Sequence, residues 1–400
     1  MRVRTFESFW LVKNGILYSY PSLQTDLKTE ILVIGGGITG ALISHALMDA
    51  GYEVMLIDKR DIAMGSSSAT TSMLQYEIDT PLYGLSEMIG EESAASCYRA
   101  GIDAILDLKK LVEEHQIDCG FQMKSSLFFA HSKKAAGWLR DEFQIRDKHR
   151  LGVRWLEADE VQSRYGLISH GAIWSETAAS VDAYKLAHEL IQLNVKRGMK
   201  VYDQTGMTQL DTSGTEPRVI LETGHTITAG KVVCCTGFES TKMLKEHVAD
   251  LFYTYVTISE EGIQLSEHIQ NTLLWNTADP YLYMRTTDDG RFLVGGEDSS
   301  FNLQFFQQSI KERKADKLAR KMAKILPGIE FVEDFTWGGT FGTTKDGLPY
   351  IGKSPEYENT LFVLGFGGNG ITFSAQGMKM IVAMLQGEKH PLESLYRFGR

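Results

Sequence analysis

The chain has 400 residues, and its 41 Lys and Arg stand against 51 Asp and Glu, which gives a formal net charge of −10. At roughly 150 residues per domain this length predicts two or three compact units, and the 43% hydrophobic and 23% charged fractions exclude intrinsic disorder. The acidic balance argues against a nucleic-acid partner, because neutralising phosphates requires a basic face. The 38 glycines beside only 8 prolines indicate backbone held in tight approaches rather than flexible linkers.

Targeting and metal signals are weak throughout the sequence. The first residues carry charge without an uninterrupted apolar segment and a cleavage site, so we expect no secretory signal. No window of about 18 uncharged apolar residues is present, which predicts that no helix spans a membrane. The four cysteines form no CxxC pair, and the ten histidines form no HxH or HxxxH pair. We therefore expect reduced, buried cysteines, no metal site and a cytoplasmic location.

The chain begins with an aromatic extension, followed by a recognisable unit. Residues 1–28 form the N-terminal extension and contain several large aromatic side chains, namely Phe9, Trp10, Tyr18 and Tyr20. Residues 30–59 then give a β-branched strand, a glycine turn, an amphipathic helix and a second apolar strand. This order predicts a βαβ unit whose parallel strands are buried on both faces.

The glycine turn of this unit carries a phosphate-binding fingerprint. Gly35, Gly37 and Gly40 satisfy GxGxxG directly after a strand and at the start of a helix. The first glycine permits the tight turn, the second lets the backbone approach a pyrophosphate, and the third allows close helix packing. Asp58 ends the second strand, where its carboxylate is placed to accept hydrogen bonds from a ribose. The unit predicts dinucleotide binding, and Asp58 disfavours a ligand with a 2′-phosphate.

A hydroxyl-rich stretch at residues 63–75 favours a flavin over a nicotinamide ligand. A nicotinamide enzyme would continue its strand alternation there, whereas this chain has AMGSSSATTSMLQ. The hydroxyls of Ser66, Ser67, Ser68 and Thr71 could donate to phosphate oxygens. On this segment alone, an ordinary Ser/Thr loop explains the composition equally well.

The remaining elements follow from periodicity. Helical spacing covers 91–118, 132–150 and 181–199, and strands are expected near Val201, on both sides of Gly224 and at 231–237. Alternation over residues 251–300 predicts an antiparallel sheet. The last segments are expected to be a charged helix at 306–325, the stretch WGGTFGTTKDGLPYIG at 337–352, a strand at 360–365 and a helix at about 371–386.

Taken together, the motifs resemble a known family. The GxGxxG unit, the GSSSATTS loop, VDAYKL before a long helix, VVCCTG, and KDGLPYIG with GFGGNGI are similar to the D-amino-acid oxidase superfamily of FAD proteins. This superfamily includes glycine oxidase, sarcosine oxidase and related amine oxidases. Ser8, Trp10 and Leu11 also resemble the start of its gamma-glutamylputrescine oxidase-like branch.

The resemblance implies an α/β fold, α+β overall, with a Rossmann-like FAD-binding domain and an interleaved antiparallel-sheet substrate domain. We assign the FAD-binding domain to residues 29–90, 165–240 and 326–400. The substrate-binding domain is assigned to residues 91–164 and 241–325.

The resemblance also implies which residues contact the cofactor. Asp58 and Lys59 stand at the adenosine ribose, and the serine and threonine loop runs along the pyrophosphate toward the flavin ring. The second glycine cluster, near the C-terminus, is expected to face the pyrimidine edge of the flavin. The complete expected set is Gly35, Gly37, Ile38, Thr39, Gly40, Asp58, Lys59, Ser66, Ser67, Ser68, Thr71, Ser72, Met207, Thr236, Gly237, Gly367, Gly368, Asn369, Gly370, Ile371 and Thr372.

Arg285 falls where glycine oxidase-like proteins hold the substrate carboxylate, and a buried carboxylate needs such a partner. Without the resemblance, a surface arginine on a strand is the simpler interpretation. Tyr283, with Tyr281 two residues before it, is expected to line the substrate pocket or simply to pack in the core. Phe341 is expected to form an apolar wall.

The sequence departs from the family pattern in three places. Phe341 replaces a second arginine of glycine oxidase-like proteins, and Leu293 replaces the lysine of sarcosine oxidases near the flavin. Gly339 and Thr340 lie where sarcosine oxidases place a flavin-linking cysteine, and the serine and threonine loop lacks the linking histidine of other relatives. We therefore expect non-covalent FAD, with the substrate and the electron acceptor left open.

The leading hypothesis is oxidation of the C–N bond of an amino acid or related amine. Hydride transfer to flavin N5 would give an imine that hydrolyses, with O2 or a carrier as the electron acceptor. One alternative is a 2-hydroxy-acid dehydrogenase that uses His170 or His225 as its base. Another is a flavin-binding subunit of a larger complex, in which the aromatic extension fits a partner groove instead of tucking into its own chain. The oligomeric state stays open.

Overall fold

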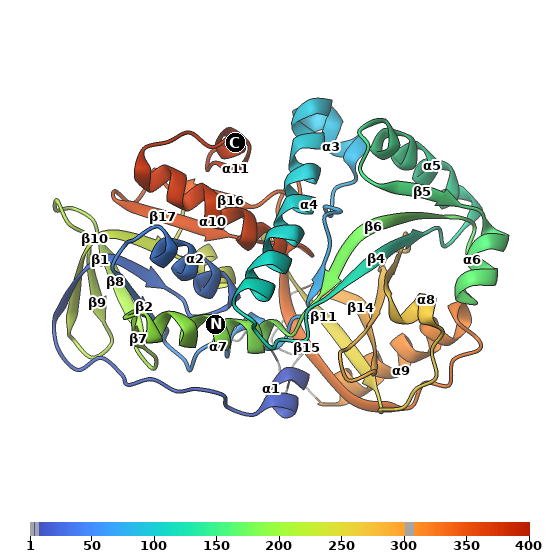
Figure 1. Ribbon diagram of the computed structural model, residues 1–400, viewed down its shortest axis with the longest axis horizontal. Coiled ribbons are helices and arrows are strands. Elements are labelled where there is room, and N and C mark those ends of the chain that lie inside the picture. The colour runs from blue at the N-terminus through green and yellow to red at the C-terminus, as the bar shows by residue number, and fades with distance from the viewer. Residues whose placement is uncertain (1–3, 5–7, 301–307) are drawn as a thin grey trace.

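The computed structural model describes residue 4 and residues 8–300 and 308–400. Within these ranges the chain forms two β-sheets that lie side by side, each with its own helices (Figure 1). The long helix α4 (Glu91–Glu114) runs near the junction of the two sheets.

The first sheet is mainly parallel and contains eight of the described strands. Its main path runs β16, β17, β10, β1, β2 and β7, and β16 is the antiparallel member of that path. β8 and β9 form an antiparallel hairpin beside the start of β10. The strands are β1 (Leu27–Ile34), β2 (Val54–Ile57), β7 (Lys200–Tyr202), β8 (Met207–Asp211), β9 (Arg218–Leu221), β10 (Thr226–Cys234), β16 (Tyr350–Lys353) and β17 (Thr360–Leu364).

The first sheet is buried on both faces, as the uninterrupted apolar run in β1 predicts. Ile31 and Val33 pack into the core formed with α2 (Ile38–Asp49), α7 (Ala183–Lys196) and α10 (Gly370–Gln386). The alternate residues of β1, Leu32 and Ile34, belong to a second core on the opposite face, beside the β8–β9 hairpin. This two-sided burial is typical of a doubly covered parallel sheet.

The second sheet contains nine of the described strands and is antiparallel except where β12 pairs with β4. Its order is β15, β11, β14, β13, β12, β4, β6 and β3, with β5 beside β6. The strands are β3 (Met73–Leu74), β4 (Gln122–Phe129), β5 (Val153–Leu156), β6 (Ala172–Ser180), β11 (Asp250–Ser259), β12 (Thr272–Asn276), β13 (Leu282–Thr286), β14 (Phe292–Ser300) and β15 (Glu333–Thr343).

One face of the second sheet is covered by α9 (Gln308–Ile325), whose Leu318 and Met322 pack against Leu282 and Met284 of β13. The alternate residues of β13 therefore point to the other face, toward the first sheet. The remaining helices are α1 (Phe9–Asn14), α3 (Leu82–Ile89), α5 (Lys133–Lys148), α6 (Ala158–Tyr165), α8 (Glu267–Gln270), α11 (Glu393–Tyr396) and the 3-10 turns η1 (Ser66–Ser68) and η2 (Gly237–Lys242).

The architecture confirms the predicted α/β class, with a Rossmann-like parallel sheet and an antiparallel second sheet. The predicted domain boundaries differ from the sheets at three places. β3 lies inside the segment 29–90, β6 inside 165–240 and β15 inside 326–400, yet all three strands belong to the second sheet. The predicted strands on either side of residue 230 are one continuous strand, β10, because Gly230 stays extended within it.

Part of the N-terminal extension is an integral part of the fold. Trp10 on α1 is fully buried, and its indole Nε1 donates to the carbonyl oxygen of Thr70 at 2.7 Å. The Asn14 side chain donates to the Asp182 carboxylate at 2.7 Å. The described aromatic residues of the extension therefore tuck into their own chain, and this favours that alternative over a partner groove. None of the described helices is both long and apolar enough to cross a lipid bilayer.

Candidate active site

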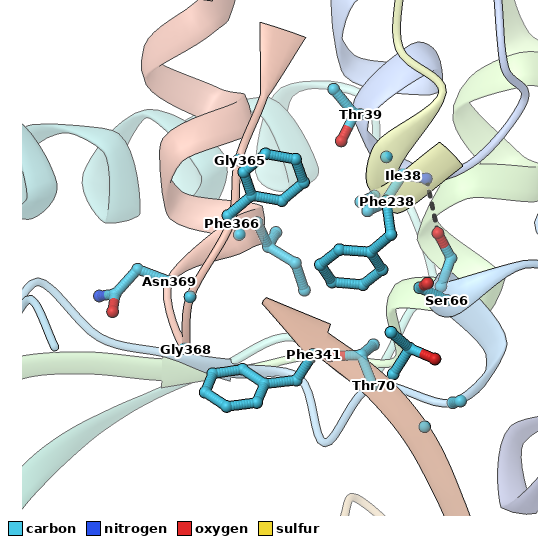
Figure 2. Close-up of a pocket in the computed structure, with 18 of the residues that line it drawn as sticks. Ile38, Thr39, Ser66, Thr70, Phe238, Phe341, Gly365, Phe366, Gly368 and Asn369 are labelled. Carbon is cyan, nitrogen blue, oxygen red and sulfur yellow. Dashed lines mark hydrogen bonds between the residues drawn. The ribbon is translucent and has the colours of Figure 1, made fainter. Parts of the chain in front are cut away.

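A cavity of about 840 Å³ lies between the two sheets. This volume is near the upper end of the roughly 300–1,000 Å³ of small-molecule sites. Its lining comes from the carboxyl ends of first-sheet strands, from the loop at 65–71 and from several second-sheet strands. Figure 2 shows Phe238, Phe341 and Phe366 around this space, with the start of α2 on one side and Gly368 on the other.

The first glycine cluster forms the turn between β1 and α2. Gly35 has a positive φ of 109°, and a Cβ there would overlap the Cys235 carbonyl oxygen. A Cβ on Gly40 would overlap the Gly35 carbonyl oxygen, so that residue sets the helix packing and does not itself line the cavity. Gly37, Ile38 and Thr39 do line it, at the N-terminus of α2, where an anion is stabilised.

Asp58 lies at the cavity wall and holds the turn that leads away from β2. Its Oδ2 accepts from the Gly36 N–H at 2.7 Å and its Oδ1 accepts from the Arg60 N–H at 2.8 Å. Burial raises the pKa of this carboxyl, although these two backbone hydrogen bonds oppose the shift. Lys59 and Arg60 also line the cavity, and both pair with Glu239, at 2.8 and 3.3 Å. The sequence did not single out Arg60 or Glu239, because their proximity depends on the fold.

The hydroxyl-rich loop is only partly directed into the cavity. Ser66, Ser67 and Thr71 line it, and the Ser67 hydroxyl oxygen accepts from the Ile38 N–H at 2.9 Å. Ser68 is buried and donates to the Gly65 carbonyl oxygen instead. Ser72 is also buried, with a positive φ of 53°. Neither Ser68 nor Ser72 lines the cavity, so both shape the loop rather than reach a ligand.

The second glycine cluster lies between β17 and α10. All its expected members line the cavity except Thr372, which is buried behind it; they are Gly367, Gly368, Asn369, Gly370 and Ile371. The Asn369 amide points away from the cavity centre and donates to the carbonyl oxygens of Gln75 and Glu77 (Figure 2). Met207, Thr236 and Gly237 line the opposite end, near Asp58.

The Arg285 guanidinium does not reach the cavity. It shares a face of β13 with Tyr283, but it lies under the hydroxyl-rich loop and Trp10. It donates to three backbone carbonyl oxygens, those of Thr71 at 2.6 Å, Thr286 at 3.2 Å and Val181 at 3.3 Å. Burial lowers its pKa to about 10. We therefore no longer assign Arg285 as the anchor of a substrate carboxylate.

The second-sheet side of the cavity is aromatic. Tyr281, Tyr283 and Phe341 line it, as expected, and three further rings that the sequence did not single out join them: Phe128, Trp138 and Trp275. Phe128 stacks on Trp275 with ring centroids 3.6 Å apart. Burial raises the pKa of the Tyr283 phenol, which therefore stays protonated. We call this set the aromatic half of the cavity.

Comparison with known proteins decides the family. Residues 30–384 match the DAO family, described as FAD dependent oxidoreductases. The chain belongs to the DAO family. A putative Rieske 2Fe-2S iron-sulfur protein of Bacillus subtilis, YhfW, is 25% identical over 402 residues, which cover 98% of this chain and 75% of that protein. Glycine oxidase of Bacillus licheniformis is 26% identical over 391 residues, which cover 93% and 96%. The crystal structure of glycine oxidase from Geobacillus kaustophilus has the same fold, with a TM-score of 0.78 at 20% identity, and covers 94% and 99% of the two chains.

DAO-family membership implies FAD, and the residues of the cavity fit this cofactor. The cavity joins the glycine turn and Asp58 at one end to the second glycine cluster, as an extended dinucleotide requires. Thr340 lines it with a buried hydroxyl that has no hydrogen-bond partner within the described residues. A bound ligand would supply that partner.

Two smaller expectations concern histidine. No histidine is among the described residues that line the cavity, so neither His170 nor His225 is placed as a base.

Away from the cavity, His45, Asp49 and His115 bring three potential metal ligands within 4.8 Å of one another. The sequence pattern could not reveal this cluster, because His115 comes from the end of a different helix. Arg197 already pairs with the Asp49 carboxylate at 2.7 Å.

Proposed function

We propose that this DAO-family protein oxidises the C–N bond of an amine or amino acid with non-covalent FAD. The observation that carries the proposal is a single cavity that runs from the dinucleotide fingerprint to a wall of aromatic side chains. When bound, FAD supplies a two-electron acceptor for the substrate hydride. The substrate carbon would lose that hydride and the nitrogen a proton, and water would then hydrolyse the resulting imine to a carbonyl compound and ammonia or an amine.

The protein residues orient the substrate rather than transfer protons through a dedicated dyad. Tyr283 keeps its phenolic proton and lies 3.5 Å from the Thr254 hydroxyl, at the aromatic wall. Phe341 adds apolar surface from β15. The protein's contribution to hydride transfer is to hold the reacting atoms close, since FAD carries the chemistry. The electron acceptor is O2 or a carrier protein.

Non-covalent attachment is supported by the residues near the cavity. Gly339 and Thr340, where some relatives have a linking cysteine, line the cavity, and no histidine does so within the described residues. Cys235 lines it from the end of the first sheet, but burial holds the pKa of its thiol well above the usual value, so it is a poor nucleophile.

The test is anaerobic reduction of the FAD-loaded protein by panels of amines, amino acids and 2-hydroxy acids, with the flavin absorbance as the readout. We expect amines or amino acids to bleach the flavin and hydroxy acids to leave it oxidised.

Asp58→Ala should weaken FAD binding about 10-fold or more, because it removes acceptors from two backbone N–H groups at the cavity wall. Asp141→Ala, on the exposed side of α5, is the matched control. Reduction by hydroxy acids alone, or a protein that never binds FAD, would refute the proposal.

A further inference from the structure

The positively charged side chains that line the cavity all lie on one side of it, where Asp58 and Glu239 accompany them. Lys59, Arg60 and Lys242 are the described lining residues with positive charge, and all three follow strands of the first sheet. The aromatic half contains no lysine, arginine or histidine within the described lining residues, and beside it lie two carboxylates, Glu77 and Asp79.

Asp79 is the first of these carboxylates and is exposed to the cavity. Both its oxygens accept from the Gly368 N–H, at 3.2 and 3.1 Å. No lysine, arginine or histidine of the described chain forms an ion pair with it. The surrounding protein raises the pKa of Asp79 to about 6 by desolvation, and the nearby Asp298 adds to the shift. A cation in the cavity would relieve both effects.

Glu77 is the second carboxylate and is only 3% exposed. Its Oε1 accepts from the Ser175 hydroxyl at 3.0 Å and lies 3.8 Å from Arg146, which is held more closely by Glu142 at 2.6 Å. Its Oε2 is buried and has no hydrogen-bond partner within the described chain. A buried carboxylate oxygen without a donor is costly, and a ligand N–H would satisfy it.

The aromatic half suits the same kind of ligand. The faces of Trp and Tyr rings attract cations, and Trp275, Tyr281 and Tyr283 all line this side. A substrate carboxylate would meet no positive partner here and would be repelled by Glu77 and Asp79. Arg285, the expected carboxylate anchor, is covered by the Thr71 carbonyl.

We propose that the substrate is a diamine or longer polyamine whose second ammonium group is held by Asp79 and Glu77 against the aromatic half. This inference rests on the proposed function and narrows it to one substrate class. The amino group at the oxidised carbon is the one that reacts, while the distant ammonium group gives affinity and orientation. A second positive charge takes the place that a carboxylate occupies in amino-acid substrates.

The first experiment compares three compounds of matched length in anaerobic reduction of the FAD-loaded protein: 1,4-diaminobutane, butylamine and 4-aminobutanoate. We expect the diamine to have the lowest apparent Kd, roughly 10- to 100-fold below butylamine, the effect of one charge-assisted hydrogen bond. The carboxylate compound should be the weakest. A panel in which 4-aminobutanoate or an α-amino acid outcompetes the diamine would overturn the inference.

The second experiment uses Asp79→Asn, which removes the charge and keeps an acceptor for the Gly368 N–H. The ratio of the apparent Kd of butylamine to that of the diamine should fall toward 1. Tetramethylammonium, which carries no oxidisable N–H, should perturb the flavin absorbance of the wild type more strongly than that of the variant. Asp141→Asn is the control. If Asp79→Asn does not fold, Glu77→Gln, which still accepts from Ser175, provides the same comparison.

The two proposals fail in different ways. If amino acids reduce the flavin and diamines do not, C–N oxidation stands and the diamine inference is wrong. If only hydroxy acids reduce it, C–N oxidation itself is wrong. An Asp79→Asn variant with an unchanged preference for the diamine would refute the assigned role of the carboxylates.

Discussion

Two carboxylates of this chain, the buried Glu142 and the cavity-exposed Asp79, differ in their partners. Glu142 is fully buried and accepts from the Leu82 and Tyr83 N–H groups and from the Arg146 guanidinium. Each of its oxygens therefore has a donor, and the charge has a matching cation. Asp79 has one backbone donor, the Gly368 N–H, and no cation among the described residues, so its charge is left for a ligand to balance.

This difference predicts how the ligand-free protein responds to pH. The pKa of Asp79 is raised from 3.8 to about 6, so the fold favours its protonated form. The stabilisation of the fold by protonated Asp79 is fully present when the pH is below the ordinary pKa of 3.8. It is lost as the pH rises through about 6. At each pH, calorimetry gives the thermal midpoint of Asp79→Asn minus that of the wild type. This difference should therefore be more positive at pH 7.5 than at pH 5. Asp141→Asn should show no such change, and a pH-independent difference for Asp79→Asn would contradict the assignment.

Single residues were predictable where a local pattern defines their role. Gly35, Gly37 and Asp58 belong to a motif of fixed spacing, and the structure places all three at the cavity. Arg285 was singled out by the family resemblance, and the structure places it on a strand as expected but outside the cavity lining. What covers the end of a strand depends on segments far away in the sequence, and here Trp10 and the Thr71 carbonyl cover it.

At the scale of elements, the turn between β1 and α2 depends on one close contact. A Cβ on Gly40 would overlap the Gly35 carbonyl oxygen, so the helix cannot keep its place with a larger residue. Gly137, within α5, has nothing within 4 Å of its Cβ position and is a matched control.

Gly40→Ala should lower the free energy of unfolding by about 3 kcal/mol, because overpacking forces α2 away from the turn. Gly137→Ala should raise it by about 0.5–1 kcal/mol, since alanine loses less entropy in a helix. Urea unfolding monitored by circular dichroism measures both changes. Equal effects of the two substitutions would show that helix propensity, and not the contact with Gly35, governs the turn.

Most elements were predictable because their periodicity is strong. The helices predicted at 91–118 and 181–199 are α4 and α7, shorter by a few residues at their ends. The predicted break near Gly230 was wrong, because a glycine in a strand marks close backbone approach as often as a turn. A Cβ there would lie 2.9 Å from the Glu30 carbonyl oxygen of the neighbouring β1.

At the scale of the whole molecule, α1 connects the N-terminal extension to the cavity. Trp10 donates to the Thr70 carbonyl, and Thr70 and Thr71 line the cavity. Phe9 stacks on Trp337 of β15, so the same short helix also contacts the second sheet. Movement of α1 would therefore loosen the loop expected to follow the pyrophosphate.

Trp10→Phe should lower the free energy of unfolding by about 1–3 kcal/mol, because the Thr70 carbonyl loses its donor. It should also weaken FAD binding, measured by titration of flavin fluorescence. Val12→Ala, on the same helix but 62% exposed, should change neither quantity measurably. A Trp10→Phe protein with lower stability and unchanged FAD affinity would show that α1 is not coupled to the loop.

The interleaved organisation was predictable, but the partners of each strand were not. β6 was not among the predicted strands, and the choice of sheet for β6 and β15 depends on hydrogen bonds to distant segments. β6 pairs with β4 and β15 pairs with β11, and both pairings draw their segments out of the predicted FAD-binding domain.

The pairing of β1 with β10, and of β10 with β17, has a consequence for synthesis of the chain. Val33 is aligned with Val233, and Val233 with Leu361, so neighbours in one sheet leave the ribosome hundreds of residues apart. The sheet that contains the apolar strands β1 and β2 can be completed only after most of the chain has been synthesised. Long-range pairing of this kind is slow and leaves strand edges open. Newly made chains are therefore expected to depend on chaperones, and truncated products to aggregate rather than persist as a free nucleotide-binding half.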